Sequence, residues 1–451
     1  MSQLLTPTQR IYTTTGLPCQ VEELLGSGTQ GEVYRTQLSD RPVALKWFYS
    51  YYIHQDVGLL DRLSEVVHLG APNDRFLWPL AIVTSPEIAG FGYIMRLREA
   101  GYRSISDLVK REVKLNFRTL ATIGLELADS FLQLHAHGLC YRDISFSNVF
   151  FHPHTGKILI SDNDNVTIDQ STSGGILGTP DFMAPEVVRR EALPSKRTDL
   201  YSLAVLLFYL FHNHHPLYGK KVLDIPCLDL PARMQLCGHD PVFIFDPDNL
   251  SNAALSETSE SDDASREAGA NAIAFWSIYP EFLKSLFVQS FTIGLRDPEQ
   301  GRVRESMWRS VMVKLRDSIF YCSHCQAENF HDIESFRTAV GSTKSCWHCH
   351  EPLQVPPRIR IDATNIVVLN FDTFLYPHHL KPDRLYDFSQ PLARVLPHFD
   401  RAELILQNLS ETPWTAISSD GNVQEIQPLQ MLPLHSGLKI LFGSAMGEIR
   451  M

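Results

Sequence analysis

Long apolar runs are missing from this chain of 451 residues, which argues against a membrane span. The longest candidate, residues 200–211, is too short and leads into a histidine-rich polar stretch. Residues 1–7 lack the basic start of a secretory signal, so we expect a cytoplasmic protein. Positive charge is also scarce, because 40 Lys and Arg stand against 51 Asp and Glu, a formal net charge of -11. This balance argues against nucleic acid or an anionic membrane as the main partner.

Cysteine is sparse as well, with 8 residues in the whole chain. Four of them share no spacing and are expected to be buried or inert thiols in a reducing compartment: Cys19, Cys140, Cys227 and Cys237. The chain does have 44% apolar residues, enough to build packed cores. Its length exceeds one core of ordinary size, so we expect about three domains.

The first organised signal is a loop around residue 143. Asp143 and Asn148 stand five residues apart after a predicted amphipathic helix. Phosphoryl transfer needs a carboxylate that orients the attacking hydroxyl and an amide oxygen that holds a metal ion on the nucleotide phosphates. Taken alone, the same spacing also fits a capping or turn device. Other motifs must therefore decide between the two interpretations.

A glycine-rich segment lies upstream, between runs of alternating apolar residues that predict strands. Its glycines are Gly26, Gly28 and Gly31, and Lys46 stands in the next predicted strand. Glycines let a hairpin approach phosphates with its backbone N–H groups, and a lysine supplies positive charge. A dinucleotide-binding turn is the alternative, but that turn opens a helix, whereas residues 32–35 predict a strand.

Further motifs follow downstream in a fixed order. Asp162 ends an apolar predicted strand, Thr179 stands in Gly-Thr-Pro, and Glu186 stands in Ala-Pro-Glu. Asp199 then opens an apolar predicted helix. With these motifs, roughly two thirds of the chain resembles a eukaryotic-like serine/threonine protein kinase. The resemblance favours phosphoryl transfer over a simple turn device.

The resemblance implies a role for each matching residue. Asp143 would orient the substrate hydroxyl, and Asn148 and Asp162 would hold Mg²⁺. Lys46 would contact the α and β phosphates of ATP. The whole ATP site would consist of Gly26, Ser27, Gly28, Thr29, Gln30, Gly31, Val33, Ala44 and Lys46.

An acid on the following helix would hold Lys46 in place. Glu65 is the predicted acid, because it lies near the family's usual distance from Lys46 and within the helical run 59–69. Asp56 and Asp61 are competitors, and all three acids could equally form a solvated helix face.

The family pattern also implies regulatory and structural contacts. Arg142 would pair with a phosphorylated activation segment. The candidate phosphorylation sites, which could equally be ordinary polar loop residues, are Ser171, Thr172 and Ser173. Glu186 would form a buried ion pair with Arg302 and anchor the substrate-binding segment, to which the structural residue Thr179 also belongs.

Departures from the family pattern bear on activity. Tyr141 replaces a histidine that mainly braces the backbone, so we expect little loss there. Asn163-Asp164 replaces Phe-Gly, which predicts different regulation. Ser145 stands where the family keeps a lysine on the γ phosphate, and losing that charge costs on the order of 1–3 kcal/mol of transition-state stabilisation. We expect a slower, active enzyme; the open alternative is a pseudokinase scaffold that binds nucleotide and partners without useful turnover.

Two C-x-x-C pairs about twenty residues apart follow the kinase-like region, the spacing of a structural zinc site. The predicted ligands are Cys322, Cys325, Cys346 and Cys349. Four thiolates fill a tetrahedral shell and leave no open position for catalysis. Unrelated thiols or a redox pair are the alternatives, and the nearby residues His324, His348 and His350 are expected to be surface side chains rather than ligands.

The C-terminal part changes to short alternating runs separated by turn residues, which predict a β-sandwich. Residues 404–410 and 436–443 resemble the last strands of forkhead-associated domains, which bind phosphothreonine. The Gly-Arg and Ser-x-x-His elements of that family are absent from this sequence. We therefore keep a sandwich that docks on a partner, or on the kinase itself, as the preferred alternative.

Together these patterns predict an α+β multidomain chain that uses ATP, Mg²⁺ and structural Zn²⁺. The expected parts are an N-terminal extension (1–19), a bilobal kinase domain (20–318, N-lobe about 20–97, C-lobe about 98–318), a zinc ribbon (319–356) and a forkhead-associated-like β-sandwich (357–451). Residues 249–271 predict a disordered acidic insertion, because they offer too little apolar surface to offset ordering entropy. The arrangement is similar to bacterial cytosolic kinases that act on a protein substrate, with the C-terminal domains recruiting a partner.

Overall fold

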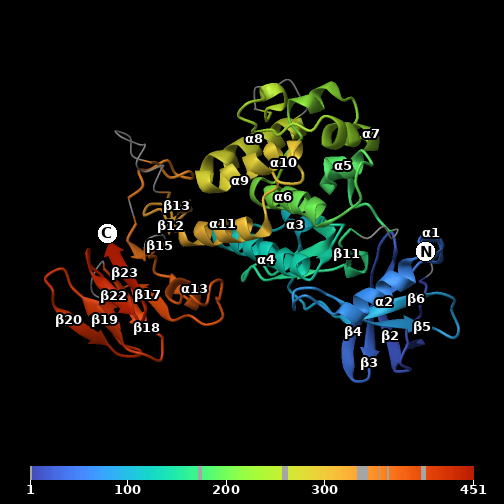
Figure 1. Cartoon of the computed structure of the whole chain (residues 1–451), viewed down its shortest axis with the longest axis horizontal. Helices are drawn as coiled ribbons and strands as arrows, with labels where there is room; N and C mark the ends of the chain where they lie inside the picture. The colour runs from blue at the N-terminus through green and yellow to red at the C-terminus, as the bar shows by residue number, and fades with distance from the viewer. Residues whose placement is uncertain are drawn as a thin grey trace. The chain divides into compact units, whose positions relative to one another are not determined.

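The structure is a computed structural model of the chain (Figure 1). It describes residues 3–170, 175–255, 263–332, 344–354, 356–362, 365–397 and 403–451. The chain divides into two compact units, which are described separately. The first unit comprises Met1–Leu115, Thr119–Ser277 and Lys284–Ser310, and the second comprises Asn116–Arg118, Ile278–Leu283 and Val311–Met451. Within the described ranges, none of the helices has both the length and the apolar character that a membrane span requires.

The first unit begins with a closed barrel of antiparallel strands, drawn in blue in Figure 1. In barrel order the strands are β1 (Arg10–Thr13), β2 (Pro18–Ser27), β3 (Gly31–Leu38), β4 (Arg41–Phe48), β6 (Phe91–Arg96) and β5 (Pro79–Thr84). Alternating residues of these strands are buried inside, among them Ile11, Val21 and Leu45. Their apolar side chains form one core.

Strand β1 lies within the predicted N-terminal extension, residues 1–19. It pairs with both β2 and β5, so this part of the extension is a strand of the barrel. Leu5, Ile11 and Cys19 are completely buried in the barrel core. Burial of these apolar side chains stabilises the segment as part of the barrel.

Two helices accompany the barrel, α1 (Ser50–Gln55) and α2 (Leu59–Leu69). Helix α2 buries Leu59, Leu63 and Val66, which stand at i, i+4 and i+7 and therefore share one face. The indole N–H of Trp78 donates to the Val66 carbonyl at 2.9 Å and fixes this face. The opposite face of α2 points to solvent.

The remainder of the first unit is mainly helical, around the almost wholly buried helix α6 (Lys196–His212). The other helices are α3 (Ile105–Val109), α4 (Phe117–Ala136), α5 (Pro185–Val188), α7 (Leu230–Met234), α8 (Asp263–Ile278), α9 (Glu281–Phe291), α10 (Ile293–Arg296) and α11 (Glu305–Asp317), of which α4, α8, α9 and α11 have residues in both units. Short strands lie among them: β7 (Arg103–Ser104), β8 (Leu139–Cys140), β9 (Val149–Phe151), β10 (Ile158–Ile160) and β11 (Thr167–Ile168). Single turns complete the part: η1 (Phe146–Asn148), η2 (Asn163–Asn165), η3 (Pro180–Phe182), η4 (Lys220–Asp224), η5 (Gln235–His239) and η6 (Leu250–Asn252).

The predicted disordered insertion over 249–271 falls partly on residues 256–262, which lie outside the described residues, and the residues on both sides of that gap are structured. Asn252 is buried and its amide donates to the carbonyls of Leu217 and Val242, while the backbone is helical again from the start of α8. Trp276 on α8 stacks on Phe245 with 4.2 Å between ring centroids. The polar composition gives no sign of the anchor at Asn252, because a buried amide with two hydrogen-bond partners fixes a short stretch of backbone without a large apolar surface.

The second unit contains a short hairpin and two larger sheets. The hairpin joins β12 (Ile319–Tyr321) and β13 (Glu328–Phe330). The larger sheet has the order β15 (Asn365–Val368), β14 (Arg358–Ile361), β23 (Ala445–Arg450), β22 (Lys439–Phe442), β19 (Trp414–Ile417) and β20 (Val423–Ile426). The smaller sheet has the order β16 (Phe374–Leu375), β17 (Ala393–Pro397), β18 (Leu404–Asn408) and β21 (Met431–Pro433), with the single-turn helix α13 (Pro377–Leu380) after β16.

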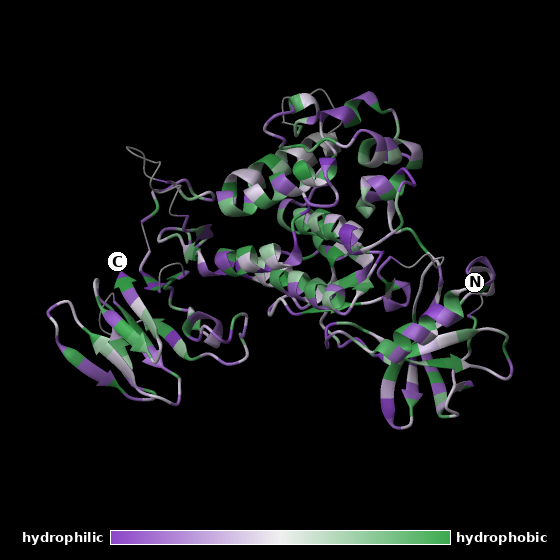
Figure 2. Cartoon of the chain, viewed as in Figure 1, coloured by the Kyte–Doolittle hydropathy of each residue, from purple (hydrophilic) through white to green (hydrophobic). Residues whose placement is uncertain are grey.

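Both larger sheets contribute to one apolar core. Ile359 and Ile440 come from one sheet, and Val395 and Leu406 come from the other. Buried and more exposed residues alternate along strands such as β14, as the mixed colours of the C-terminal strands in Figure 2 show. The C-terminal part is therefore built from two sheets that enclose a common core.

Candidate active site

The glycine-rich hairpin between β2 and β3 uses its glycines in two ways. A Cβ at Gly31 would collide with the carbonyl oxygen of Trp47, because β3 and β4 approach closely there. A Cβ at Gly26 would meet no atom within 4 Å, and one at Gly28 only the Gly31 carbonyl at 4.0 Å. Gly31 is thus required by strand pairing, whereas the first two glycines leave open space where phosphate oxygens could approach.

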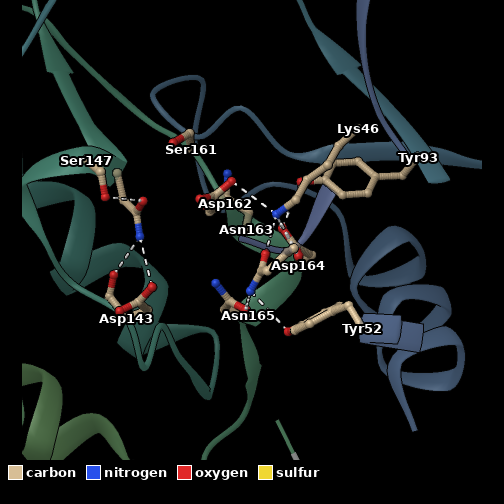
Figure 3. Close-up of polar contacts among 12 residues, drawn as sticks. Lys46, Tyr52, Tyr93, Asp143, Ser147, Ser161, Asp162, Asn163, Asp164 and Asn165 are labelled. Carbon is tan, nitrogen blue, oxygen red and sulfur yellow. Dashed lines mark hydrogen bonds and ion pairs between the residues drawn. The ribbon is translucent and has the colours of Figure 1, made fainter. Parts of the chain in front are cut away.

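Lys46 on β4 is buried, and its Nζ donates hydrogen bonds to three residues. It donates to Gln30 Oε1 at 2.6 Å, to Asp162 Oδ1 at 3.2 Å and to Asp164 Oδ1 at 3.0 Å. Figure 3 shows the amine pointing between the two carboxylates. Burial by itself would lower the pKa of Lys46, but the two carboxylates outweigh it and the pKa is raised. Lys46 is therefore a fixed positive charge.

The predicted pair of Lys46 with Glu65 is not formed in this structure. Glu65 lies on the exposed face of α2, and the ion pairs of Lys46 are with Asp162 and Asp164 instead. The helix turns its apolar residues inward, together with Arg62, so Glu65 falls on the solvent side. The competitors do not replace it either, because Asp61 is exposed and Asp56 pairs with Arg62.

The turn after β10 supplies an acid, Asp164, for which the sequence motifs predict no role in the site. Asp162 has a left-handed backbone with φ 51°, and η2 follows at once. The Asp164 side chain is 0% exposed and accepts from the Tyr93 hydroxyl at 2.8 Å. Asn163 is buried and its amide donates to the Ile160 carbonyl at 2.9 Å. The sequence did contain a sign of this role, because a second acid stands two residues after Asp162, at a position where the family has glycine.

The predicted catalytic loop holds Asp143 by three hydrogen bonds. The Asn148 amide donates to the Asp143 carbonyl at 2.8 Å and to its Oδ2 at 3.2 Å. Thr179 Oγ1 donates to Asp143 Oδ1 at 2.8 Å. Burial raises the pKa of Asp143, although the bonds from Thr179 and Asn148 act in the opposite direction. The arrangement presents an oriented carboxylate, as a proton acceptor for a substrate hydroxyl requires.

A buried carboxylate fixes the backbone of this loop. Asp199 on α6 accepts from the N–H groups of Tyr141 at 2.5 Å and Arg142 at 3.0 Å, and it meets His135 Nε2 at 3.2 Å. Arg142 has a left-handed backbone with φ 75°. The Tyr141 hydroxyl donates to the Ser161 carbonyl, so this replacement of histidine ties the catalytic loop to the turn before Asp162.

Oxygen donors suited to a magnesium ion stand on these two loops. Asp162 is 37% exposed at its side chain, and the amide oxygen of Asn148 accepts from Ser147 Oγ at 3.1 Å. Mg²⁺ prefers such carboxylate and carbonyl oxygens. Ser145 is buried, with its Oγ 3.1 Å from Ser147 Oγ, and brings no positive charge to the loop.

The remaining predicted contacts lie around the α5 segment. Glu186 and Arg302 form an ion pair with 2.7 Å between Oε1 and Nη2, and Arg302 also donates to the Arg197 carbonyl at 2.7 Å. Arg142 is buried. The phosphorylation candidates Ser171, Thr172 and Ser173 lie outside the described residues.

In the second unit, the four predicted zinc ligands come together. Cys322 Sγ lies 3.7 Å from Cys349 Sγ, and Cys325 Sγ lies 3.7 Å from Cys346 Sγ. A tetrahedral Zn²⁺ with Zn–S bonds of about 2.3 Å requires sulfur separations of about 3.8 Å. These distances are far beyond a disulfide bond and fit a metal shell.

Hydrogen-bond donors around Cys346 favour its thiolate. The amide of Asn329 and the backbone N–H of His348 approach Cys346 Sγ at 3.5 and 3.4 Å. Burial raises the pKa of Cys346, but the backbone N–H of Cys349, these two groups and the Cys325 thiol outweigh it and lower the pKa to about 6. The pKa of Cys349 shifts the other way: the backbone N–H of Glu351 would lower it, but burial and the neighbouring thiols raise it. The side chains of His324, His348 and His350 are exposed, and none of them belongs to the thiol group.

A second group of ligand-type residues, Asp317, His378 and His379, has the wrong protonation for a metal. Backbone N–H groups donate to Nδ1 of His378 at 2.8 Å and to Nδ1 of His379 at 2.9 Å. In a neutral imidazole the other nitrogen, Nε2, then carries the proton. His379 Nε2 lies 3.3 Å from Asp317 Oδ1, so this group is a hydrogen-bonded cluster.

Comparison with known proteins agrees with the geometry of the first unit. Residues 19–237 match the family model described as the protein kinase domain. The chain is 26% identical over 246 residues to the mitogen-activated protein kinase kinase kinase mom-4 of Caenorhabditis elegans, covering 50% of this chain and 44% of that protein. It is 28% identical over 219 residues to CBL-interacting protein kinase 4 of Oryza sativa subsp. japonica, covering 46% and 47%.

A third relative is the probable serine/threonine-protein kinase WNK8 of Oryza sativa subsp. japonica, 24% identical over 208 residues, with 45% of this chain and 33% of that protein covered. The chain thus spans less than half the length of the relatives it matches. The matched domain implies a bilobal kinase fold, with the barrel and the helical part as its lobes. The matches support a protein serine/threonine kinase.

Proposed function

We propose that this chain, which carries a protein kinase domain, transfers the γ phosphate of ATP to serine or threonine side chains of a protein partner. The observation that supports this most directly is that Lys46 on β4 pairs with Asp162, while Asp143 and Asn148 bond to each other on the neighbouring loop. Figure 3 shows Asp143 on one side of this group and Lys46 with Asp162 on the other. Phosphoryl transfer depends mainly on such positioning and on charge stabilisation.

In the proposed reaction, Asp143 accepts a hydrogen bond from the substrate hydroxyl and orients it for in-line attack. The hydroxyl oxygen forms the new bond to phosphorus, its proton passes to Asp143, and ADP leaves with the electron pair of the broken bond. Lys46 stabilises the phosphate charge on the donor side, and Asn148 and Asp162 would hold Mg²⁺. The metal supplies charge neutralisation on the phosphates.

The decisive experiment is magnesium-dependent autophosphorylation of the whole chain, measured by mass spectrometry. Asp143→Asn and Lys46→Ala serve as controls, because each removes one charge of the proposed site. Phosphate on the wild type and on neither control supports the enzyme. ATP binding without phosphate on any sample would instead favour the pseudokinase scaffold.

We further propose a structural Zn²⁺ in the cysteine cluster over 319–356. The two sulfur separations of 3.7 Å and the N–H groups aimed at Cys346 support this proposal. Elemental analysis should give about one zinc per chain. A protein that is fully folded without metal would contradict it.

The two C-terminal sheets are proposed to recruit a protein partner, and a forkhead-associated-like phosphopeptide site is the more specific version of this proposal. Their common core supports an independent binding module. Binding of paired peptides with phosphothreonine or plain threonine tests the specific version, since equal affinity would remove it. A cytoplasmic location and a bacterial source stay predictions from the sequence.

A further inference from the structure

We propose that Asp164 is the positioning residue for Lys46 and takes the place of the helix acid on which protein kinases rely. The proposal deepens the proposed function and rests on it. The carboxylate comes from the η2 turn and not from α2. The acid that holds the phosphate-binding lysine has therefore moved to the loop that carries Asp162.

The contacts of Asp164 distinguish it from an incidental neighbour. Both of its oxygens lie within hydrogen-bond distance of Lys46 Nζ, Oδ1 at 3.0 Å and Oδ2 at 3.1 Å. The Tyr93 hydroxyl donates to Oδ1 at 2.8 Å and holds the carboxylate from the side of β6. The side chain of Asp164 is 0% exposed, and that of Lys46 is 5% exposed. Charge-assisted hydrogen bonds of this kind are the strong ones in proteins.

Burial makes this pair persistent. A buried carboxylate that loses its cation is strongly destabilised, because neither water nor another cation compensates its charge. Asp162 is 37% exposed, so it can exchange Lys46 for a metal ion or water at a smaller cost. Among the acids around Lys46, Asp164 is thus the one that must stay paired.

The three donors of Lys46 also define what an arriving phosphate must displace. An ammonium group has three N–H donors, and Gln30, Asp162 and Asp164 accept from them. Gln30 is neutral and stands at the tip of the glycine-rich hairpin, so it is the acceptor that a phosphate replaces most easily. Asp164 then remains behind the lysine and holds it toward the phosphates.

The test is a double-mutant cycle on nucleotide binding, measured by calorimetry with Mg²⁺ and a non-hydrolysable ATP analogue. Asp164→Asn keeps the shape and removes the charge, and we expect it to weaken binding by about ten- to hundredfold. Lys46→Ala should weaken binding similarly, and the double variant should lose no more than Lys46→Ala alone, because Asp164 acts through Lys46. Additive losses would overturn the proposal.

Two further variants separate positioning from a general loss of fold. Tyr93→Phe removes only the hydroxyl, and we expect a loss of about two- to tenfold in affinity, with a folded protein whose melting temperature is lowered by the loss of one buried hydrogen bond. Glu65→Gln is the matched control on the helix and should bind like the wild type. A loss in Glu65→Gln that equals the loss in Asp164→Asn would return the role to the helix acid and overturn the proposal.

Steady-state phosphorylation separates this inference from the proposed function. A raised KM for ATP in Asp164→Asn, with a smaller change in kcat, supports a role through Lys46 in phosphate binding. A wild type that binds nucleotide with a non-additive cycle but transfers no phosphate would sink the proposed function and leave the positioning role standing. A wild type that transfers phosphate, with Asp164→Asn equal in affinity and rate, would sink the positioning role alone.

Discussion

The kinase-like domain and the C-terminal unit each gather ligand-type side chains, but with opposite chemistry. Around Lys46 the ligands are oxygens of Asp162 and Asp164, one of them half-exposed and one fully buried. In the C-terminal unit the ligands are four thiols, paired at 3.7 Å. The oxygen site can exchange one partner for another, whereas four sulfurs leave a tetrahedral metal no free position.

The difference shows how each site relates to its fold. The oxygen site depends on a barrel and on helices that fold around their own apolar cores, so it needs no metal to form. The cluster around the thiols is small, with Phe320 and Leu353 among its few apolar residues. We therefore expect metal to decide the fold of the second site and only the activity of the first.

The largest expected effect is the removal of zinc. Cys346→Ser, or chelation of the wild type, should unfold the segment around residues 319–354, because structural zinc contributes on the order of 10 kcal/mol in small domains. Hydrogen exchange of the β12–β13 hairpin measures this loss. Cys227→Ser is the control, since this exposed thiol lies outside the cluster. If the hairpin amides stay equally protected from hydrogen exchange after chelation, metal does not decide the fold of the second site.

The next effect is the pH dependence of stability, which we expect to have opposite signs in the two units. Burial would lower the pKa of His135, but hydrogen bonds with Asp199 and Glu305 raise it from 6.5 to about 9. The protonated form is favoured in the folded state, so this contribution of about 3 kcal/mol is fully present below pH 6.5 and disappears as pH rises through about 9. Zinc binding instead weakens as pH falls, because the thiolates become protonated.

Thermal unfolding of the wild type and of His135→Gln, compared at pH 6.5 and pH 9, measures the first half of this contrast. The stability difference between the two proteins should be larger at the lower pH. An equal difference at both values would mean that the ion network of His135 does not respond to pH as proposed.

A smaller effect is expected at the catalytic loop. Ser145→Lys should raise the phosphorylation rate by up to roughly tenfold, since a lysine there would bring positive charge toward the γ phosphate. Ser145→Met introduces a long side chain that, unlike lysine, carries no charge. It should not accelerate the reaction. An unchanged rate in Ser145→Lys would show that the loop is already fully supported by other groups.

The smallest effect concerns the exchangeable partner of Lys46. Gln30→Ala removes the acceptor 2.6 Å from Nζ, so ATP no longer has to displace it. We expect affinity for Mg²⁺ and ATP to rise by about two- to fivefold, which corresponds to less than about 1 kcal/mol. Gln37→Ala, at a glutamine of β3 that donates to Glu22 outside the predicted ATP site, is the matched control. Weaker binding in Gln30→Ala would mean that the amide contacts the nucleotide instead.

Much of the site could be predicted from short motifs. Asp143 with Asn148, and the two cysteines within each C-x-x-C pair, are local spacings that a loop or turn can bring together. The kinase-like region could be predicted because its motifs keep a fixed order. The β-rich character of the C-terminal part followed from its alternating strands.

Predictions failed where a contact depends on distant parts of the chain. Glu65 has a suitable distance in sequence from Lys46, but the apolar face of α2 decides which way the helix turns. Strand β1 was not predicted, because a short segment is held by a few buried anchors such as Leu5 and Ile11. The spacing of apolar residues within a segment does not show which of them pack against distant parts of the chain.

The sequence by itself determined the chemical inventory of this protein: a lysine, acids and an amide for phosphates and metal, and four thiols for a second metal. The tertiary structure alone decided that Asp164, and not Glu65, meets Lys46. The physical reason is that a buried ion pair forms between whichever charges the packed elements bring within hydrogen-bond distance. In this protein the apolar face of α2 turns Glu65 outward, and the turn after β10 carries Asp164 inward.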